Sequence, residues 1–492
     1  MYSTLNRKQL LGRLYANASV YGVGIILVRA GSILLLPLYW LRLEPADYGV
    51  IGLSQAVVLF LAPVLGIGLY DAVQRLYYDW NAEERPHYLT AVWVGTIAVS
   101  LAICGLLDAL GTALFALVFE QVTFDPYLRI AIWTAFATNL SMLPLTLLRV
   151  REHLRHYTLI VFGQFLTQTG ITLYLIFFMD MGVVGYLLGA LISAMLWGGY
   201  FIVHMLREAR WPFRRAHFAE PLRYALPIVP AALLDGLNTV IDRYFLDKFV
   251  GLQQIGLYAL AHQFGQGFNV FNQIMKNSWF PFIYRVSSER DDAPHVLAKF
   301  SLYYLAVLAL PALGIALLSR ELILFFGDEK YFGIYEYIPA FVLFYYMHAI
   351  ANSFGRGLDL AKRMAYTPLI QIVGLAVGII SMWLLIPRFG LWGAVSAMLM
   401  ANLVRTTLLI GLAHHFYPRP LLVGPMLRLA IIIAITYVFG NAIATGSVVT
   451  DAFLKAMTVL VGGTAMAWFA LDRKPAMALA GHAVRFFRTR IR

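Results

Sequence analysis

The sequence has a single cysteine, Cys104, in 492 residues, and charged residues make up only 13% of it. One cysteine excludes an intramolecular disulfide and a cysteine metal cluster. The chain also lacks a glycine-rich phosphate loop and a metalloprotease histidine pair, and its apolar runs leave no room for a soluble catalytic domain. The sequence therefore indicates a protein that is not an enzyme, and it predicts no metal and no cofactor.

Apolar residues are what the chain has in abundance, at 60% of the sequence. The mean hydropathy of +0.72 lies far above that of a soluble domain. The net charge of +12 could suggest a nucleic-acid partner, but the basic residues form short clusters between long apolar runs. This pattern is typical of membrane topology, so we expect membrane lipids and not nucleic acid as the surroundings.

Runs of about twenty apolar residues predict an all-α polytopic membrane protein with about fourteen transmembrane helices. The expected spans are 17–41, 49–73, 88–118, 127–148, 157–179, 183–206, 222–247, 253–284, 296–318, 334–356, 366–386, 391–413, 424–444 and 452–471. The first run follows a basic segment but is too long for a cleaved signal peptide, so it is interpreted as a retained helix.

The basic residues lie mostly in alternate connections between these spans. They include Arg149, Arg151, Arg155, Arg207, Arg210, Arg214, Arg215, Arg285, Arg290, Lys362, Arg363 and the tail from Arg473 to Arg492. We expect the chain in a bacterial inner membrane, and by the positive-inside rule this asymmetry predicts both termini in the cytoplasm.

Three short patterns recur at a nearly constant offset. Gly49 and Gly256 lie 207 positions apart (256 − 49), Gly182 and Gly390 lie 208 apart (390 − 182), and Tyr157-Thr158 recurs 209 positions later (366 − 157) as Tyr366-Thr367. Each pattern falls at the corresponding helix of its half. The chain is therefore expected to contain two copies of a six-helix unit, and an even number of helices gives both copies the same orientation, related by an axis along the membrane normal.

This repeat predicts the domain organisation. We expect an N-lobe over 1–206, a basic cytoplasmic connector over 207–221, a C-lobe over 222–413, two extra helices over 424–471 and a basic tail over 472–492. The two extra helices could line a groove for a lipid tail or pack on the second lobe, and the sequence favours neither.

Charged side chains inside the spans are the first candidates for function. A charge near the bilayer centre costs about 2.5–3.5 kcal/mol on insertion scales, so such a residue needs a reason to be there. Arg29, Asp235 and Arg405 lie within predicted spans. We predict that they line a substrate cavity; an internal salt bridge such as Asp235 to Arg29 is the other interpretation.

The span 253–284 is the most polar one. Polar residues recur in it at spacings of three and four, so much of one face is polar. The candidates are Gln263, Gln266, Asn269, Asn272, Gln273 and Lys276. They are predicted to bind substrate, with the cations attracting a phosphate and the amides contacting sugar hydroxyls. The alternative is hydrogen bonding between helices.

Several of these patterns resemble a known family. Leu36-Pro37-Leu38-Tyr39, Glu44-Pro45-Ala46-Asp47-Tyr48-Gly49-Val50 and Gly66-Ile67-Gly68-Leu69 resemble the polysaccharide transport family, which includes O-antigen and exopolysaccharide flippases. Leu226-Pro227-Ile228-Val229-Pro230, Ile241-Asp242-Arg243-Tyr244-Phe245 and Gly256-Leu257-Tyr258 look like its seventh helix and the segment that follows.

The resemblance implies membership in the multidrug/oligosaccharidyl-lipid/polysaccharide exporter superfamily, with two facing lobes that rock between inward-open and outward-open states. It implies a flippase whose substrate is an undecaprenyl-pyrophosphate-linked oligosaccharide, an O-antigen, capsule or exopolysaccharide unit moved to the periplasmic leaflet. Polysaccharide polymerase or synthase proteins are the partners that it implies.

Three alternatives stay open from the sequence. A peptidoglycan-precursor flippase of the same superfamily would usually have more arginines in its first two helices than Arg29 alone. A cation-coupled multidrug exporter would want an acidic cavity, for which Asp235 and Asp242 are candidates, but it would have twelve helices. A scaffold of a polysaccharide-synthase complex is the third. The sequence fixes neither the sugar nor the coupling ion.

Overall fold

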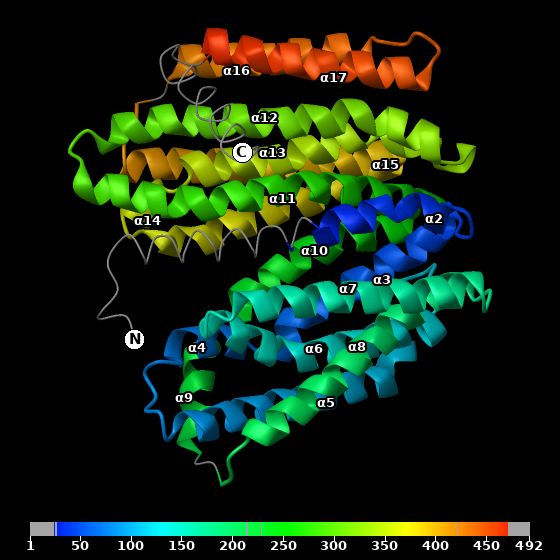
Figure 1. Cartoon of the computed structure of the whole chain (residues 1–492), viewed down its shortest axis with the longest axis vertical. Helices are drawn as coiled ribbons and strands as arrows, with labels where there is room; N and C mark the ends of the chain where they lie inside the picture. Colours follow the sequence, from blue (N-terminus) through cyan, green and yellow to red (C-terminus); the bar gives the residue numbers. More distant parts are fainter. Residues whose placement is uncertain (1–23, 25–26, 213–214, 228, 421, 471–492) are drawn as a thin grey trace, which may run out of the picture. The chain divides into compact units, whose positions relative to one another are not determined.

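Helices make up all the regular structure of the described residues, 24, 27–212, 215–227, 229–420 and 422–470, in a computed structural model of the chain (Figure 1). The helices are α2 (Leu36–Trp40), α3 (Pro45–Gly66), α4 (Leu69–Leu76), α5 (Arg85–Ala116), α6 (Arg129–Val150), α7 (Leu154–Phe177), α8 (Gly182–Glu208), α9 (Ala216–Ala225), α10 (Val229–Phe249), α11 (Leu252–Glu289), α12 (Ala293–Phe326), α13 (Ile338–Phe354), α14 (Gly357–Leu360), α15 (Thr367–Phe416), α16 (Val423–Asn441) and α17 (Val448–Ala465), with short π or 3₁₀ segments at Phe124–Leu128, Glu329–Glu336, Met364–Tyr366 and Met466–Ala470.

Nine helices in this described part are long and apolar enough to cross a membrane. One of them, Met364–Phe416, covers 53 residues and contains two of the predicted spans. Gly390 interrupts its helical backbone between these two spans. An all-α polytopic membrane protein is therefore confirmed, whereas the count of fourteen spans stays a prediction. The predicted tail, 472–492, and the beginning of the first predicted span, 17–23 and 25–26, lie outside the described residues.

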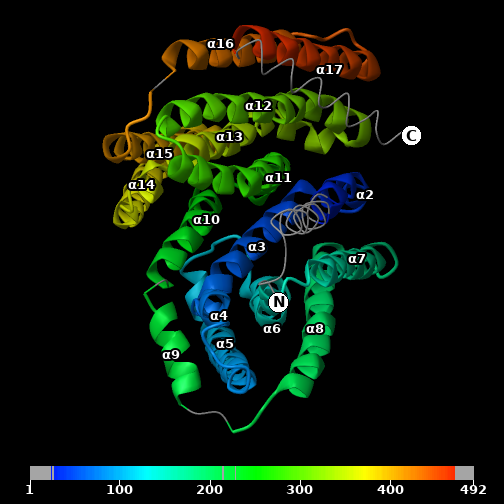
Figure 2. The ribbon, with the colours of Figure 1, turned by 60° about the vertical axis from the view of Figure 1, so that its left-hand side comes forward.

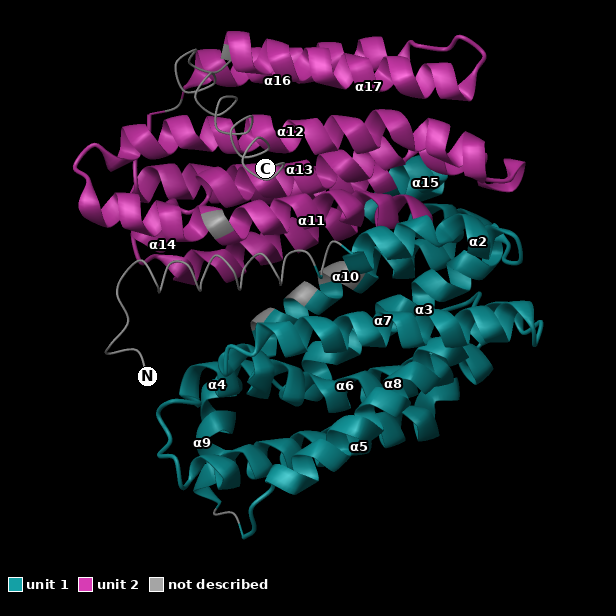
Figure 3. Cartoon of the chain, viewed as in Figure 1, with its two compact units in different colours: residues 1–259, 382–394 teal, residues 260–381, 395–492 magenta. Residues whose placement is uncertain are grey.

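The chain forms two compact units (Figure 3). Unit 1 contains residues 1–259 and 382–394, and unit 2 contains residues 260–381 and 395–492. Because this division falls inside α11 and α15, it does not test the predicted lobe boundaries, which stay a prediction.

The core of unit 1 lies where α4, α5, α6, α8 and α9 meet. Large side chains that are wholly or almost wholly buried fill it, including Leu69, Tyr88, Val92, Leu143 and Met205. The short helix α9 packs against both α4 and α5, as Figure 2 shows. Because of this packing, the connection between α8 and α10 lies at the same end of the unit as the first turn of α5.

The family-like motif at Glu44 forms the start of α3. The Glu44 side chain accepts a hydrogen bond from the amide of Asp47, and the Asp47 carboxylate accepts one from the Glu44 amide at 2.8 Å. Pro45 follows at the first helical position, where its missing N–H costs nothing. This capping box supplies partners for backbone amides that would otherwise have none.

Equivalent glycines of the repeat share one unusual backbone conformation. Gly182 has φ of +50° where α8 begins, and Gly390 has φ of +53° at the break inside α15. Glycine is the residue that adopts this left-handed region without steric cost. The two positions that the sequence pairs at an offset of 208 therefore share a positive φ, one where α8 begins and one at the break inside α15.

In unit 2, α16 and α17 pack on α12. Gly440 and Gly463 allow close approach to Leu317 and Leu310 of α12. The ammonium of Lys455 on α17 forms an ion pair with Glu321 of α12, and both side chains are almost completely buried. α16 and α17 thus pack on a preceding helix, and the choice between the two roles predicted for them stays a prediction.

Candidate functional site

The polar stripe of α11 divides into buried and accessible members. Asn272 is buried, and its Oδ1 accepts a hydrogen bond of 2.8 Å from the Tyr304 hydroxyl of α12. Its amide also donates to Asn269 Oδ1 at 3.3 Å. Asn272 therefore joins two helices, which is the alternative interpretation of the stripe. Within unit 2, Gln263 and Lys276 are partly buried and Gln273 is exposed.

Gln266 belongs to a chain of polar contacts that runs from α11 to α13. Its side-chain nitrogen lies 3.3 Å from His262 Nδ1, and the Tyr345 hydroxyl lies 2.9 Å from His262 Nε2. The two rings of His262 and Tyr345 are stacked, with centroids 5.8 Å apart. Both imidazole nitrogens of His262 are thus engaged.

Arg405 occupies a second group of polar contacts between α13 and α15. Its guanidinium hydrogen-bonds His348 Nε2 and donates to Asn402 Oδ1 at 3.0 Å. The Phe344 carbonyl oxygen lies 3.0 Å from His348 Nδ1 and accepts a hydrogen bond of the same length from Asn402. Arg405 is therefore held by neighbouring side chains, and its other face stays partly accessible within unit 2.

The rings of Tyr345 and His348, with centroids 5.8 Å apart, connect these two groups. We call the six residues His262, Gln266, Tyr345, His348, Asn402 and Arg405 the unit 2 polar cluster. Two imidazoles and a phenol can accept and pass protons, while the arginine can bind an anion. His262, Tyr345, His348 and Asn402 were not predicted from the sequence, although the spacing of four between His262 and Gln266 places both on one face of α11.

A pair of cations lies on one aromatic ring elsewhere in unit 2. The Lys276 ammonium is 5.5 Å from the centroid of the Phe280 ring, and the Arg356 guanidinium carbon is 3.7 Å from it. Arg356 also pairs with Asp359 at 2.9 Å. Within the described residues Lys276 has neither an acidic partner nor a hydrogen bond, so its charge is available to an anionic ligand.

Two predicted residues lie in unit 1. Arg29 is exposed within the helical segment Leu27–Trp40, and its carbonyl accepts a hydrogen bond of 2.8 Å from Ser32. Asp235 lies on α10, and its side chain is outside what the structure describes. The structure thus links Gln266 to Arg405 through the polar cluster and Asn269 to Asn272 directly. The suggested pairing of Asp235 with Arg29 stays untested.

Comparison with known proteins gives the family. The family described as polysaccharide biosynthesis protein matches residues 42–336, more than half of the chain. The chain belongs to this family. The resemblance that the sequence patterns indicated is thereby confirmed at the level of the family.

Proteins similar to this chain share few identical residues with it. A protein of Haemophilus influenzae, described as an uncharacterized membrane protein, is 20% identical over 341 residues, which are 67% of this chain and 80% of that protein. A structure of the lipid II flippase MurJ in an inward closed conformation has a TM-score of 0.67 at 15% identity and covers 92% of this chain and 97% of its own.

A second solved structure, an inward-facing multidrug resistance MATE family transporter of the MOP superfamily, has a TM-score of 0.61 at 12% identity. The match covers 79% of this chain and 97% of that one. At these identities the likeness shows the fold, which is that of MOP superfamily transporters.

The second family-like motif forms a buried ion pair in unit 1. The Asp242 carboxylate pairs with the Arg243 guanidinium and accepts a hydrogen bond of 2.7 Å from the Tyr258 hydroxyl. The same guanidinium lies 5.2 Å from the centroid of the Tyr258 ring. All three side chains are less than 10% exposed. The motif therefore ties the end of α10 to the start of α11.

Asp247 makes a further tie at the same end of α10. Its carboxylate accepts hydrogen bonds from the backbone amides of Glu120 and Gln121, and the Gln121 side chain donates to the carbonyls of Asp247 and Val250. These bonds join the connection after α5 to the turn between α10 and α11. Asp242 of the second motif and the nearby Asp247 therefore both have structural partners.

Proposed function

We propose that this protein is a flippase that moves an undecaprenyl-pyrophosphate-linked oligosaccharide from the cytoplasmic to the periplasmic leaflet by alternating access. Membership in the polysaccharide biosynthesis family and the fold of MOP superfamily transporters support this proposal. The oligosaccharide would be an O-antigen, capsule or exopolysaccharide unit. The protein would move it without forming or breaking a covalent bond.

The observation that carries the proposal is the pair of cations at Phe280. Lys276 and Arg356 bring two positive charges to one ring, and one acid, Asp359, pairs with Arg356. A pyrophosphate group carries charge that such a pair can bind. Gln263 and Gln273, on the same helix, have accessible amides that suit sugar hydroxyls.

The unit 2 polar cluster favours this substrate over a cationic drug. Its six members are neutral or cationic, with Arg405 as the charged one. A site for a drug cation would place a carboxylate or an open aromatic face at this position. A peptidoglycan-precursor flippase would share the pyrophosphate, so the sugar chain is what distinguishes that alternative.

The test is flipping of a fluorescent undecaprenyl-pyrophosphate oligosaccharide by the full-length protein in proteoliposomes, with a membrane-impermeant quencher to report the leaflet. Lys276→Gln should slow flipping, whereas Lys362→Gln, which removes an exposed lysine in the connection after α14, should not. Substitution at Arg29 or Arg405 is tested in the same way.

Equal flipping by the Lys276→Gln and Lys362→Gln variants would remove Lys276 from the site. Flipping of a pyrophosphate-linked peptidoglycan precursor but not of the oligosaccharide would favour the second flippase. Absence of flipping under every imposed ion gradient would contradict the proposal as a whole.

The proposal also predicts the location of the protein and its partners. The protein would lie in the bacterial inner membrane with both termini in the cytoplasm, next to polysaccharide polymerase or synthase proteins. Since Cys104 is the one natural cysteine, a Cys104→Ser chain with a single cysteine at position 155 or 180 reports orientation. Labelling of position 155 from the cytoplasmic side and of position 180 from the periplasmic side is expected.

A further inference from the structure

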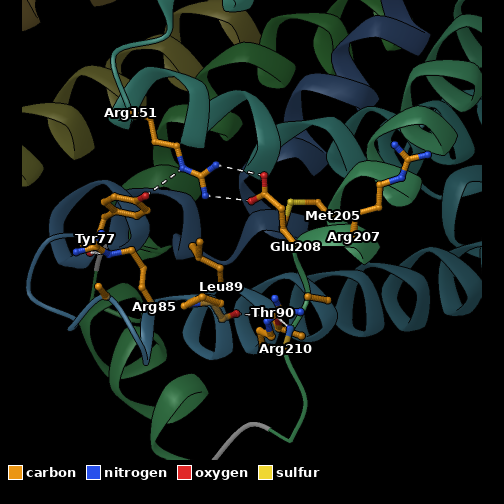
Figure 4. Close-up of a pocket in the computed structure, with 12 residues that line it drawn as sticks. Tyr77, Arg85, Leu89, Thr90, Arg151, Met205, Arg207, Glu208 and Arg210 are labelled. Carbon is orange, nitrogen blue, oxygen red and sulfur yellow. Dashed lines mark hydrogen bonds and ion pairs between the residues drawn. The ribbon is translucent and has the colours of Figure 1, made fainter.

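A cavity of about 380 Å³ lies at one end of unit 1 (Figure 4). This volume falls in the usual range of small-molecule sites. Its lining includes Tyr77, Arg85, Thr90, Arg151, Glu208 and Arg210. None of these residues was predicted to bind substrate, and the cavity lies wholly within unit 1, whereas Lys276 and Arg405 lie in unit 2.

The position of this cavity matches the depth of lipid headgroups. Arg85 is the first residue of α5, Arg151 directly follows α6, and Glu208 is the last residue of α8. Each of these helices is long and apolar enough to span a membrane. Residues at the ends of such spans lie at the interface between the apolar core and water.

The walls of the cavity carry more positive than negative charge. The Arg85 side chain donates to two backbone carbonyls, of Tyr77 at 3.0 Å and of Trp80 at 3.0 Å, so these contacts do not cancel its charge. The Arg210 side chain is exposed and has no acidic partner among the described residues. Its backbone amide donates to Thr90 Oγ1 at 3.0 Å, which fixes the chain at the edge of the cavity.

Arg207 also belongs to the lining, but Figure 4 shows its side chain directed away from Arg85 and Arg151. Arg207 is therefore not among the residues proposed to bind the anion. The remaining cations are Arg85, Arg151 and Arg210, and Glu208 is the acid that lines the cavity with them.

Glu208 occupies the place that an anion would take. Arg151 donates to it through both terminal nitrogens, at 3.4 and 3.1 Å, and to the Tyr77 hydroxyl through Nε at 3.0 Å. Burial by itself lowers the pKa of the Arg151 guanidinium, but the hydrogen bonds to Glu208 and Tyr77 raise it above its ordinary value. Arg151 is therefore charged in this setting, and a phosphate can compete with Glu208 for it.

A second cavity, of about 150 Å³, lies next to the same ion pair. Arg151, Met205 and Glu208 line both cavities, so this pair forms part of the wall between them. His204 approaches Glu208 at 3.5 Å from the side of the second cavity. If a ligand draws Arg151 away, His204 remains within reach of the carboxylate.

We propose that the cavity between α5, α6 and α8 binds a phosphate-bearing anion, with the headgroup of an anionic phospholipid as the occupant that its depth favours. Arg85, Arg151 and Arg210 hold the phosphate, and Glu208 keeps Arg151 in place while the cavity is empty. The proposal does not depend on the transported substrate, because no residue of this cavity belongs to the site in unit 2.

The test measures binding of the full-length protein, in a neutral detergent, to phosphatidylglycerol, with phosphatidylcholine as the reference lipid. A basic residue near a membrane surface contributes about fivefold to the affinity for anionic lipid. The double variant Arg85→Gln/Arg210→Gln should therefore bind phosphatidylglycerol on the order of 25-fold more weakly. The matched control is Arg155→Gln, an exposed arginine near the start of α7 that does not line the cavity.

A variant that is expected to bind lipid more tightly distinguishes a true loss of binding from a loss caused by unfolding. Glu208→Gln removes the competing charge, so it should bind phosphatidylglycerol more tightly than the natural protein. Inorganic pyrophosphate, added as a soluble probe, distinguishes the source: if it binds in the same Arg85- and Arg210-dependent way and the lipid does not, the anion is soluble. Equal lipid and pyrophosphate binding by the double variant and by Arg155→Gln would overturn the proposal.

Discussion

Gly49 of α3 and Gly256 of α11 meet backbone to backbone. A Cβ atom on Gly256 would overlap the Pro45 carbonyl oxygen and lie 3.0 Å from the Gly49 nitrogen, and one on Gly49 would overlap the Leu252 carbonyl oxygen. Gly52 and Ala259, one helical turn further on, also contact each other across this junction. Both pairs have the offset of 207 that defines the repeat, so equivalent positions of the repeated pattern pack against each other within unit 1.

Substitution at this junction should be disruptive. Gly256→Ala places a methyl group against the Pro45 backbone, which has no flexible end to move, so the thermal unfolding midpoint should fall, with a cost of about 1–3 kcal/mol. The control is Gly170→Ala in α7, where an added Cβ meets nothing within 4 Å. A Gly256→Ala protein as stable as the Gly170→Ala protein would contradict the close packing.

Asp242 should be essential for stability. Asp242→Ala removes the carboxylate that pairs with the buried Arg243 guanidinium, and breaking a buried pair costs about 3–5 kcal/mol. Asp292→Ala breaks the exposed pair with Arg290, where solvent screens the charges, and should change the unfolding midpoint little. Thermal unfolding in detergent compares the two, and equal midpoints would argue against a structural role for the second family motif.

At the ion pair between Lys455 and Glu321, a single substitution should lower stability and a double substitution should restore most of it. Lys455→Met should destabilise unit 2 by about 3–5 kcal/mol, because it leaves Glu321 charged and buried. The double variant Lys455→Met/Glu321→Leu should recover most of that loss, since apolar side chains of similar volume can replace a buried pair. Protease sensitivity of α16 and α17 measures both, and a double variant as sensitive as the single one would refute this account.

The contribution of Arg405 to flipping should depend on the planar shape of its guanidinium group as well as on its charge. One terminal nitrogen serves both His348 and Asn402, and a lysine keeps the charge but loses the planar fork. Arg405→Lys should therefore reduce flipping by roughly tenfold, the worth of one charge-assisted hydrogen bond. The matched control is Arg363→Lys, at an exposed site whose aromatic contact with Phe416 a lysine can keep. Full activity of Arg405→Lys would mean that the charge alone matters.

The fold was predictable because lipid imposes simple rules on a sequence. Long apolar runs predicted the helices, and the recurring glycines predicted a repeat whose members Gly182 and Gly390 share a left-handed backbone. What the sequence did not show is the partner of each polar residue. Asn272 and Gln273 are neighbours in one stripe, yet the first bonds Tyr304 and the second is exposed. A difference of one position on a helix rotates a side chain by 100°, and composition does not reveal which face is covered.

The candidate site was predictable only in part for the same reason. Arg405 and Gln266 stood out because charges and amides are costly in a span, whereas His348 did not, since a neutral histidine in an apolar helix carries a weak signal. The cavity at Arg85 and Arg151 was missed for another reason. Arg151 and Arg210 had already been explained by topology, Arg85 had not been singled out, and the ends of separate helices bring these residues together.

The pair of Lys455 and Glu321 also bears on how the chain is inserted into the membrane during synthesis. Glu321 precedes Lys455 by 134 positions, so α12 emerges from the ribosome long before α17. An unpaired lysine entering the bilayer is expensive, and an acid already in place removes most of that cost. Insertion of the hairpin of α16 and α17 is then templated by an earlier helix, and a chain that lost Glu321 but kept Lys455 would fail at the translocon before its stability could be measured.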